Sequence, residues 1–219
     1  MTWIKICGTT NLDDAQLAVE AGADALGFVF YDKSPRNIDP EKAREIVTEL
    51  PAYVEKVGVF VDDSFKHIRD VVEQVKLTAV QFYTRTWEHV EDLVSANGNA
   101  ISPKLIMALP ADELSQADVL IQTRILHAIM LDSGSSERPG GTGKTFDWKR
   151  AHGVIQGLSL TVPVIVAGGL TPLNVGEAVK FFQPYGVDVA SGVEAKPGKK
   201  DSRKVQAFVR AVREADKLA

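Results

Sequence analysis

Two side chains of this sequence have the chemistry to exchange a proton with a small substrate. They are Cys7, the single cysteine of the chain, and Asp132, which follows a short apolar run. A thiolate can accept a proton and a carboxylic acid can give one, so the pair suits acid–base catalysis. The unperturbed pKa is about 8.5 for a cysteine and about 3.9 for an aspartate, so such a site would have to lower the pKa of Cys7 and raise that of Asp132. Taken singly, a cysteine is often a small buried hydrophobe and an aspartate often a helix cap.

A glycine-rich segment follows Asp132 and ends in the letters GTGKT. The phosphate-binding loop of ATPases and GTPases, G-x-x-x-x-G-K-[ST], needs a glycine five positions before Gly143, and that position holds Arg138. The match therefore fails. The segment is a glycine-rich loop after a strand and not a nucleotide cradle.

Short runs rich in β-branched residues recur along the chain, with amphipathic stretches between them. The expected strands are Trp3–Ile6, Ala25–Phe30, Val57–Val61, Ala79–Phe82, Lys104–Met107, Ala128–Leu131, Val164–Ala167 and Val187–Ala190. Near-continuous apolar strands joined by helices indicate a parallel sheet covered on both faces. Eight such units are the number at which the sheet closes into a (β/α)₈, or TIM, barrel. An open doubly wound sheet is the alternative, because the unit at Pro110–Thr123 has the weakest helix pattern.

Residues that favour helix starts precede the expected helices. They are Asn11 before Leu12, Asp39 with Pro40, Ser64 before Phe65, Thr171-Pro172 before Leu173, and Asp201-Ser202 before Arg203. No linker rich in proline, glycine or serine divides the chain. We therefore expect a single catalytic (β/α)₈ domain over residues 1–219.

Composition narrows the class of protein. The chain is 45% hydrophobic and 25% charged with a formal net charge of −4, which is typical of a globular protein and favours neither nucleic acid nor a membrane as partner. One cysteine excludes an internal disulfide and fits a cytoplasmic location. The four histidines lie far apart without metal-binding spacing, so we expect no metal site.

Turns with glycine follow the last two expected strands: Gly168-Gly169 and Ser191-Gly192. In a closed barrel the active site forms at the carboxyl ends of the strands, and phosphate commonly binds after strands 7 and 8. Glycine turns that lead into a helix expose backbone N–H groups to an anion. Either turn alone is more typical of a tight strand-to-helix connection. Together they predict a phosphorylated small-molecule substrate.

Arg36 lies in the loop after the second expected strand. Its planar guanidinium could hold a substrate carboxylate, although surface arginines are more commonly solvated. A Schiff base would need a lysine at the carboxyl end of a strand, whereas Lys5 lies within the first strand. No dinucleotide fingerprint follows that strand, so neither imine nor nicotinamide chemistry is predicted.

Motifs spread along nearly the whole chain point to one enzyme family. They are KICG (5–8), GFVF (27–30), SPR (34–36), VGVFV (57–61), LDS (131–133), GGTG (140–143), FDW (146–148), AGGL (167–170) and SGVE (191–194). Each motif is weak by itself. In this order and at these intervals, the set closely resembles the phosphoribosylanthranilate isomerases of tryptophan biosynthesis.

The resemblance implies a (β/α)₈ barrel, monomeric or homodimeric, that works without metal or cofactor. The implied reaction is the Amadori rearrangement of N-(5-phosphoribosyl)anthranilate to 1-(2-carboxyphenylamino)-1-deoxyribulose 5-phosphate. Asp132 is implied as the general acid on the ribose ring oxygen, Cys7 as the base at C2, and Arg36 as the partner of the anthranilate carboxylate. The residues implied to bind the substrate phosphate or to close a loop over the site are Gly141, Gly143, Gly168, Gly169, Ser191 and Gly192.

One departure from the family lies after the fourth expected strand. The family usually has Q-L-H-G there, and this chain has Gln81-Phe82-Tyr83-Thr84. The family's histidine lies near the substrate but is neither the proton donor nor the acceptor. We therefore expect an altered affinity or rate and not a lost reaction.

Other functions remain open at the level of sequence. Another phosphate-binding barrel, such as an indole-glycerol-phosphate synthase, would need a catalytic lysine that is not found at a strand end. A phosphometabolite-binding protein that has lost catalysis fits the missing histidine, but Cys7 and Asp132 argue against it. Activity on a related histidine-pathway substrate would need a second phosphate site, and no second pair of glycine turns is evident.

Overall fold

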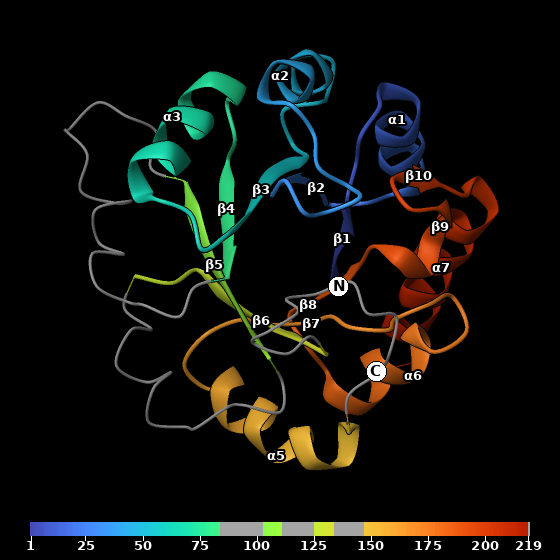
Figure 1. The fold of residues 1–219 in the computed structure, drawn as a ribbon. Helices are drawn as coiled ribbons and strands as arrows, with labels where there is room; N and C mark the ends of the chain where they lie inside the picture. Colours follow the sequence, from blue (N-terminus) through green and yellow to red (C-terminus); the bar gives the residue numbers. More distant parts are fainter. Residues whose placement is uncertain (84–102, 111–124, 134–146, 219) are drawn as a thin grey trace.

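Eight parallel strands form a closed barrel in the computed structural model, which describes residues 1–83, 103–110, 125–133 and 147–218 (Figure 1). The strands are β1 Trp3–Cys7, β2 Ala25–Phe30, β3 Glu55–Val61, β4 Ala79–Tyr83, β5 Lys104–Pro110, β6 Ala128–Asp132, β7 Val164–Val166 and β8 Gly186–Val189. Each strand pairs with the next one along the chain, and β8 pairs with β1. This closure confirms the predicted TIM barrel and excludes the open sheet.

Helices surround the barrel on its outer face (Figure 1). They are α1 Leu12–Ala21, α2 Pro40–Thr48, α3 Phe65–Val75, α5 Trp148–Ser159, α6 Val175–Phe182 and α7 Ser202–Asp216. A short 3₁₀ turn, η2 Ser191–Val193, follows β8 and leads into an antiparallel pair, β9 Glu194–Lys196 and β10 Lys199–Lys200. The helix expected within Pro110–Thr123 lies outside the described residues.

The predicted helix starts are confirmed at four of the five positions. The side chains of Asn11, Asp39, Ser64 and Asp201 each accept a hydrogen bond from a backbone N–H in the first turn of the following helix. These bonds satisfy donors that have no partner within the helix.

The start predicted at Thr171-Pro172 is wrong, because α6 begins only at Val175. The intervening residues form a turn held by Asn174, whose Oδ1 accepts from the Thr171 N–H at 2.7 Å. Its Nδ2 donates to the carbonyl of Gly169 at 3.0 Å. The polar side chains therefore fix the loop after β7 instead of capping a helix.

Strand alternation divides the apolar residues into two layers. Ile4 and Ile6 of β1 belong to the large cluster between the strands and the helices. The lower barrel interior is a separate cluster of mostly small or branched apolar residues, with Ala25, Val57 and Ile165 among them. Because successive side chains point to opposite faces of a strand, Lys5 and Cys7 point inward with this second set. The barrel interior above this set therefore contains a charged side chain, Lys5, as well as apolar ones such as Val29 and Val59.

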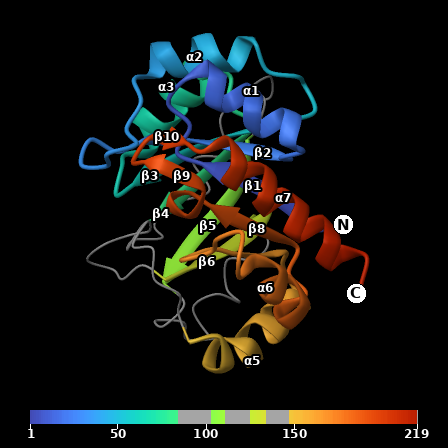
Figure 2. The same cartoon turned by 90° about the vertical axis from the view of Figure 1, so that its right-hand side faces the viewer.

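The first and last elements of the chain lie side by side. Figure 2 shows α7 beside α1 and α6, close to the point where β1 enters the barrel. The carboxylate of Asp216 in α7 accepts hydrogen bonds from the N–H and the hydroxyl of Thr2. Barrel closure is thus reinforced by contacts between the two ends of the chain.

Neither a membrane-spanning helix nor a metal-binding cluster occurs in the part of the chain that the structure describes. Every described helix is too short or too polar to cross a bilayer. No three His, Cys, Asp or Glu side chains among the described residues gather closely enough to hold a metal ion.

Candidate active site

The predicted site residues that the structure describes lie at the carboxyl end of the barrel. Cys7 ends β1, Asp132 ends β6, and Arg36 lies in the loop after β2. One pocket contains the acid together with both glycine turns, and its lining residues are Asp132, Gly168, Gly169, Leu170, Asp188, Val189, Ala190, Ser191 and Gly192. Cys7 and Arg36 do not line this pocket but lie around the neighbouring ends of β1 and β2. Gly141 and Gly143 lie outside the described residues.

The glycines after β7 and β8 are required by close approaches of other chain segments. Gly168 has a φ of 81°, and a Cβ there would lie 2.4 Å from the N–H nitrogen of Ser133. A Cβ on Gly192 would lie 1.9 Å from the carbonyl oxygen of Leu170. The two turns and the residue after Asp132 are therefore packed directly against one another, which fixes their relative positions.

The turn after β7 presents donors to the pocket. Within the described residues, the backbone N–H groups of Gly168 and Gly169 donate to no protein acceptor. Asn174 holds the carbonyl of Gly169. Backbone N–H groups fixed in this way are suited to an anion such as a phosphate.

Cys7 is buried, with 7% of its surface exposed. Gly27 of β2 makes room for the thiol, because a Cβ at that position would lie 2.7 Å from Sγ. Burial raises the pKa of Cys7, and Asp188 raises it further, while Lys5 and Lys200 oppose the rise. The surroundings of Cys7 therefore do not lower its pKa as the chemistry of a base would require, because loss of hydration outweighs the nearby positive charges.

A buried ion pair lies beneath the thiol. Lys5 Nζ contacts Asp188 Oδ1 at 2.7 Å, and Lys5 is fully buried. Burial lowers the pKa of Lys5, but Asp188 and Cys7 more than compensate, so the pKa lies above its usual value. The side chain therefore carries a positive charge next to Cys7. Sequence reasoning noted Lys5 only as a strand residue, although the two-residue spacing from Cys7 places both on the same face.

Arg36 is held by a partner that sequence reasoning missed, Glu194. Arg36 Nε donates to Glu194 Oε1 at 2.9 Å and Nη2 donates to Oε2 at 2.8 Å. Burial raises the pKa of Glu194, but Arg36 and Lys200 outweigh it and hold the pKa below its usual value. The stem of Arg36 passes over Gly8, where a Cβ would lie 2.5 Å from Cδ. Within the described residues Nη1 makes no hydrogen bond, so one edge of the guanidinium is available for a ligand.

Lys200 joins this pair to the first strand. Its ammonium contacts Glu194 Oε1 at 3.1 Å and also donates to the carbonyl oxygen of Cys7. Burial lowers the pKa of Lys200. The hairpin β9–β10 thus ties Arg36 to the end of β1 through a chain of charged contacts.

Tyr83 occupies the position at which the family usually has histidine. Its hydroxyl donates to Asp132 Oδ2 at 3.0 Å. Ser133 Oγ lies 3.4 Å from the other carboxylate oxygen, Oδ1. The predicted acid therefore has polar neighbours at both oxygens, and the residue that departs from the family contacts it directly. Thr84, the second departure, lies outside the described residues.

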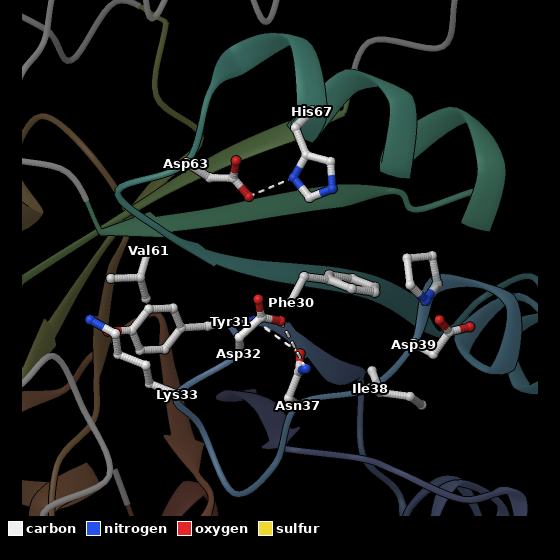
Figure 3. A pocket seen from close by; sticks show the side chains of 11 residues that line it. Phe30, Tyr31, Asp32, Lys33, Asn37, Ile38, Asp39, Val61, Asp63 and His67 are labelled. Atoms are coloured by element: carbon white, nitrogen blue, oxygen red, sulfur yellow. Dashed lines mark hydrogen bonds and ion pairs between the residues drawn. The ribbon is translucent and has the colours of Figure 1, made fainter.

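A second pocket opens on the same rim, beyond β2 and β3 (Figure 3). Figure 3 shows His67 facing Asp63, with Nδ1 to Oδ2 at 2.7 Å, and Asn37 facing Asp32 at 3.2 Å. None of the predicted site residues lines it. The predicted site residues that the structure describes therefore lie outside this pocket, around β1, β6, β7 and β8 and, for Arg36, in the loop after β2.

Comparison with known proteins gives a consistent result over nearly the full length. The chain matches the family model described as N-(5'phosphoribosyl)anthranilate (PRA) isomerase over residues 4–211. The N-(5'-phosphoribosyl)anthranilate isomerase of Pseudomonas putida (strain GB-1) is 44% identical over 213 residues, which cover 96% of this chain and 97% of that protein. The enzyme of the same name from Geotalea uraniireducens (strain Rf4) is 42% identical over 210 residues, covering 96% and 98%.

Solved structures show the same similarity. Phosphoribosyl anthranilate isomerase from Thermotoga maritima superposes with a TM-score of 0.83 at 39% identity, covering 98% of this chain and 100% of that one. A phosphoribosyl anthranilate isomerase in complex with reduced 1-(o-carboxyphenylamino)-1-deoxyribulose 5-phosphate superposes with a TM-score of 0.78 at 37% identity and the same coverage.

Proposed function

The chain belongs to the N-(5'-phosphoribosyl)anthranilate isomerase family of tryptophan biosynthesis, and on that premise we propose the reaction and the roles of its residues. The proposed reaction is the Amadori rearrangement of N-(5-phosphoribosyl)anthranilate to 1-(2-carboxyphenylamino)-1-deoxyribulose 5-phosphate. It is an isomerisation, so every proton that leaves one atom of the substrate must be balanced by a proton delivered to another. One acid and one base are sufficient for this chemistry.

The first proposed step opens the ribose ring. Asp132, as a carboxylic acid, transfers its proton to the ring oxygen while the bond from C1 to that oxygen breaks. The lone pair of the anthranilate nitrogen forms a double bond to C1, which leaves an iminium ion and an Asp132 carboxylate. The position of Asp132 beside the glycine turns supports this role, because the ring oxygen and the phosphate belong to the same small sugar.

The second proposed step removes a proton from C2. The Cys7 thiolate accepts it, the electron pair forms a double bond between C1 and C2, and the iminium π electrons return to nitrogen. The resulting enolamine gives the ketone when a proton is added to C1 and the hydroxyl on C2 gives up its proton, which together restore the Cys7 thiolate and the Asp132 carboxylic acid. Burial raises the pKa of Cys7, so the neighbouring charges of Lys5 and Lys200 are needed to favour the thiolate.

The two negatively charged ends of the substrate, its phosphate and its carboxylate, are bound by different groups of the protein. We assign the phosphate to the N–H groups around Gly168, Gly169, Ser191 and Gly192. The anthranilate carboxylate is assigned to the open edge of Arg36, which Glu194 holds in place. Gly141 and Gly143 stay predicted as parts of a loop that closes over the site.

The observation that carries this proposal is the pocket that combines Asp132 with both glycine turns. The test is turnover of N-(5-phosphoribosyl)anthranilate, followed by the fluorescence of its anthranilate group. Cys7→Ala and Asp132→Asn should each lower kcat by about 10²- to 10⁴-fold while the far-ultraviolet circular dichroism of the barrel stays unchanged. Near wild-type turnover in either variant would show that its assigned role is wrong.

The same assay separates the alternatives left open by the sequence. A phosphometabolite-binding protein would bind the substrate saturably without any product. Family membership favours the isomerase over an indole-glycerol-phosphate synthase, and Lys5 is engaged in a buried ion pair instead of lying at a strand end. The Thermotoga maritima enzyme is described as dimeric and has also been crystallised as monomers, so monomer and homodimer both stay predictions for this chain. The cytoplasmic location and the single domain over residues 1–219 also stay predictions.

A further inference from the structure

The hydroxyl of Tyr83 reaches the predicted general acid across the barrel. Tyr83 ends β4 and Asp132 ends β6, and these strands are separated in the sheet by β5. The 3.0 Å hydrogen bond from the hydroxyl to Asp132 Oδ2 therefore passes over the interior of the barrel and not along the sheet. It lies at the carboxyl end, where the substrate is expected.

A second contact orients the hydroxyl. Gln81, two residues earlier on the same face of β4, donates from Nε2 to the Tyr83 oxygen at 3.4 Å. An amide nitrogen can only donate, so the tyrosine must use its own proton for Asp132. Burial raises the pKa of Tyr83 well above its usual value, and Asp132 and other negative groups raise it further. The phenol therefore remains a protonated donor throughout the physiological pH range.

The ring of Tyr83 is fixed from the other side of the site. It packs against the small cluster formed by Cys7, Val29 and Val59. The ring of Tyr83 thus packs against the cluster that contains the predicted base, and its hydroxyl contacts the predicted acid. A phenylalanine at this position would keep the ring contacts and lose the two hydrogen bonds of the hydroxyl, the one to Asp132 and the one from Gln81.

We propose that Tyr83 is a positioning residue for Asp132, which it holds by its hydroxyl and whose negative charge it stabilises as the ring-opening proton leaves. This inference rests on the proposed function, since it needs Asp132 to be the acid. Before the transfer the hydroxyl faces a neutral acid, and afterwards it faces a carboxylate. A hydrogen bond to a charged acceptor is stronger than one to a neutral acceptor, so the contact strengthens as the reaction proceeds and lowers the barrier.

The test is a double-mutant cycle with the variants Tyr83→Phe, Asp132→Asn and both together, assayed on N-(5-phosphoribosyl)anthranilate. Tyr83→Phe should lower kcat about 10-fold with KM unchanged, because the lost contact acts mainly in the transition state. In the Asp132→Asn background, Tyr83→Phe should lower kcat by less than about twofold, because no carboxylate charge develops at position 132. A matched control is Tyr185→Phe, whose ring stacks on Trp3 at the opposite end of the barrel and which should keep wild-type kcat.

The outcomes of the cycle are distinguishable. An equal loss in both backgrounds, or a rise in KM with kcat unchanged, would overturn the role of Tyr83 while leaving the acid assignment intact. Wild-type turnover by Tyr83→Phe, together with an inactive Asp132→Asn variant, would also overturn the role of Tyr83 and leave the acid assignment intact. Wild-type turnover by Asp132→Asn alone would instead refute the proposed acid, and this inference with it.

Discussion

Glu194 receives both hydrogen bonds of one edge of the Arg36 guanidinium, at 2.9 Å and 2.8 Å, so the residue predicted to bind the substrate carboxylate is itself held by a carboxylate. Paired N–H donors and carboxylate oxygens fix the plane of an arginine as well as its position. The free edge of the guanidinium is thereby aimed without any contribution from the substrate. An arginine fixed in advance loses less conformational entropy when the ligand binds.

Replacing this carboxylate by an amide tests its importance for binding. Glu194→Gln should raise KM for N-(5-phosphoribosyl)anthranilate about 10-fold or more, with a smaller change in kcat, because Arg36 loses one acceptor and its charge partner. Lys200 loses its negatively charged partner as well and keeps only the carbonyl oxygen of Cys7, so the free energy of unfolding should fall by about 1–3 kcal/mol. Steady-state kinetics and urea unfolding measure the two effects. An unchanged KM in a normally folded variant would show that Glu194 does not position Arg36.

Removing either member of the ion pair between Lys5 and Asp188 should shift the pKa of Cys7, and the two shifts should be in opposite directions. Lys5→Met removes a positive charge that favours the thiolate, so the pKa of Cys7 should rise. Asp188→Asn removes a negative charge that disfavours the thiolate, so the pKa of Cys7 should fall. Because the chain has one cysteine, the rate of alkylation by iodoacetamide against pH measures this group alone. Shifts in the same direction for both variants would contradict the assignment.

The ion pair also contributes to stability. Lys5→Met leaves Asp188 buried without its charge partner, and breaking a buried pair from one side commonly costs about 3–5 kcal/mol. Urea unfolding at neutral pH measures this cost. A loss below about 1 kcal/mol would indicate that water or another cation reaches Asp188 in the variant.

At position 192, in the turn after β8, no residue larger than glycine should be tolerated. In Gly192→Ala the new Cβ would lie 1.9 Å from the carbonyl oxygen of Leu170, so one of the two turns must move. We expect weaker competitive inhibition by inorganic phosphate and a higher KM for the substrate. The matched control is Gly153→Ala in α5, where a Cβ has nothing within 4 Å. This helical substitution should keep KM and stabilise the chain by about 0.5–1 kcal/mol.

Acid should weaken the contact between α1 and β10. Asp14 accepts hydrogen bonds from Lys199 Nζ at 2.7 Å, the Lys200 N–H at 2.8 Å and Asn11 Nδ2 at 2.9 Å. Burial raises the pKa of Asp14, but these donors outweigh it and hold the pKa below the usual value of 3.8. The folded state therefore binds the proton less tightly than the unfolded state. The resulting stabilisation is present above pH 3.8 and is lost as the pH falls through the folded pKa.

Asp14→Asn measures this contribution. Its unfolding free energy should lie below that of the wild type at neutral pH, and the difference should shrink as the pH falls below about 4. The exposed neighbour Asp13 provides the control, since in the described residues it makes none of these hydrogen bonds, and Asp13→Asn should follow the wild-type pH profile. A constant difference at all pH values would show that the Asp14 carboxylate is not coupled to folding in this way.

Much of the fold could be predicted because it depends on local patterns. Apolar runs mark the strands, and Asn11, Asp39 and Ser64 mark helix starts, since capping satisfies donors a few residues away in the chain. The count of eight units then implies closure. The prediction failed at Thr171-Pro172, where the polar side chain of Asn174 bonds to the loop before it and delays the helix.

The sequence by itself determined the barrel, the places of Cys7 and Asp132 at strand ends, and the glycine turns after the last two strands. Only the tertiary structure decided which groups surround them. Lys5 and Asp188 are 183 positions apart, and Arg36 and Glu194 are 158 apart, yet each pair is in hydrogen-bonding contact. The reason is closure itself: β8 pairs with β1, and strand ends from distant parts of the chain meet at one rim. No local pattern records which charges become neighbours there, and those charges act on the pKa of Cys7 together with its burial and hold Arg36 in place.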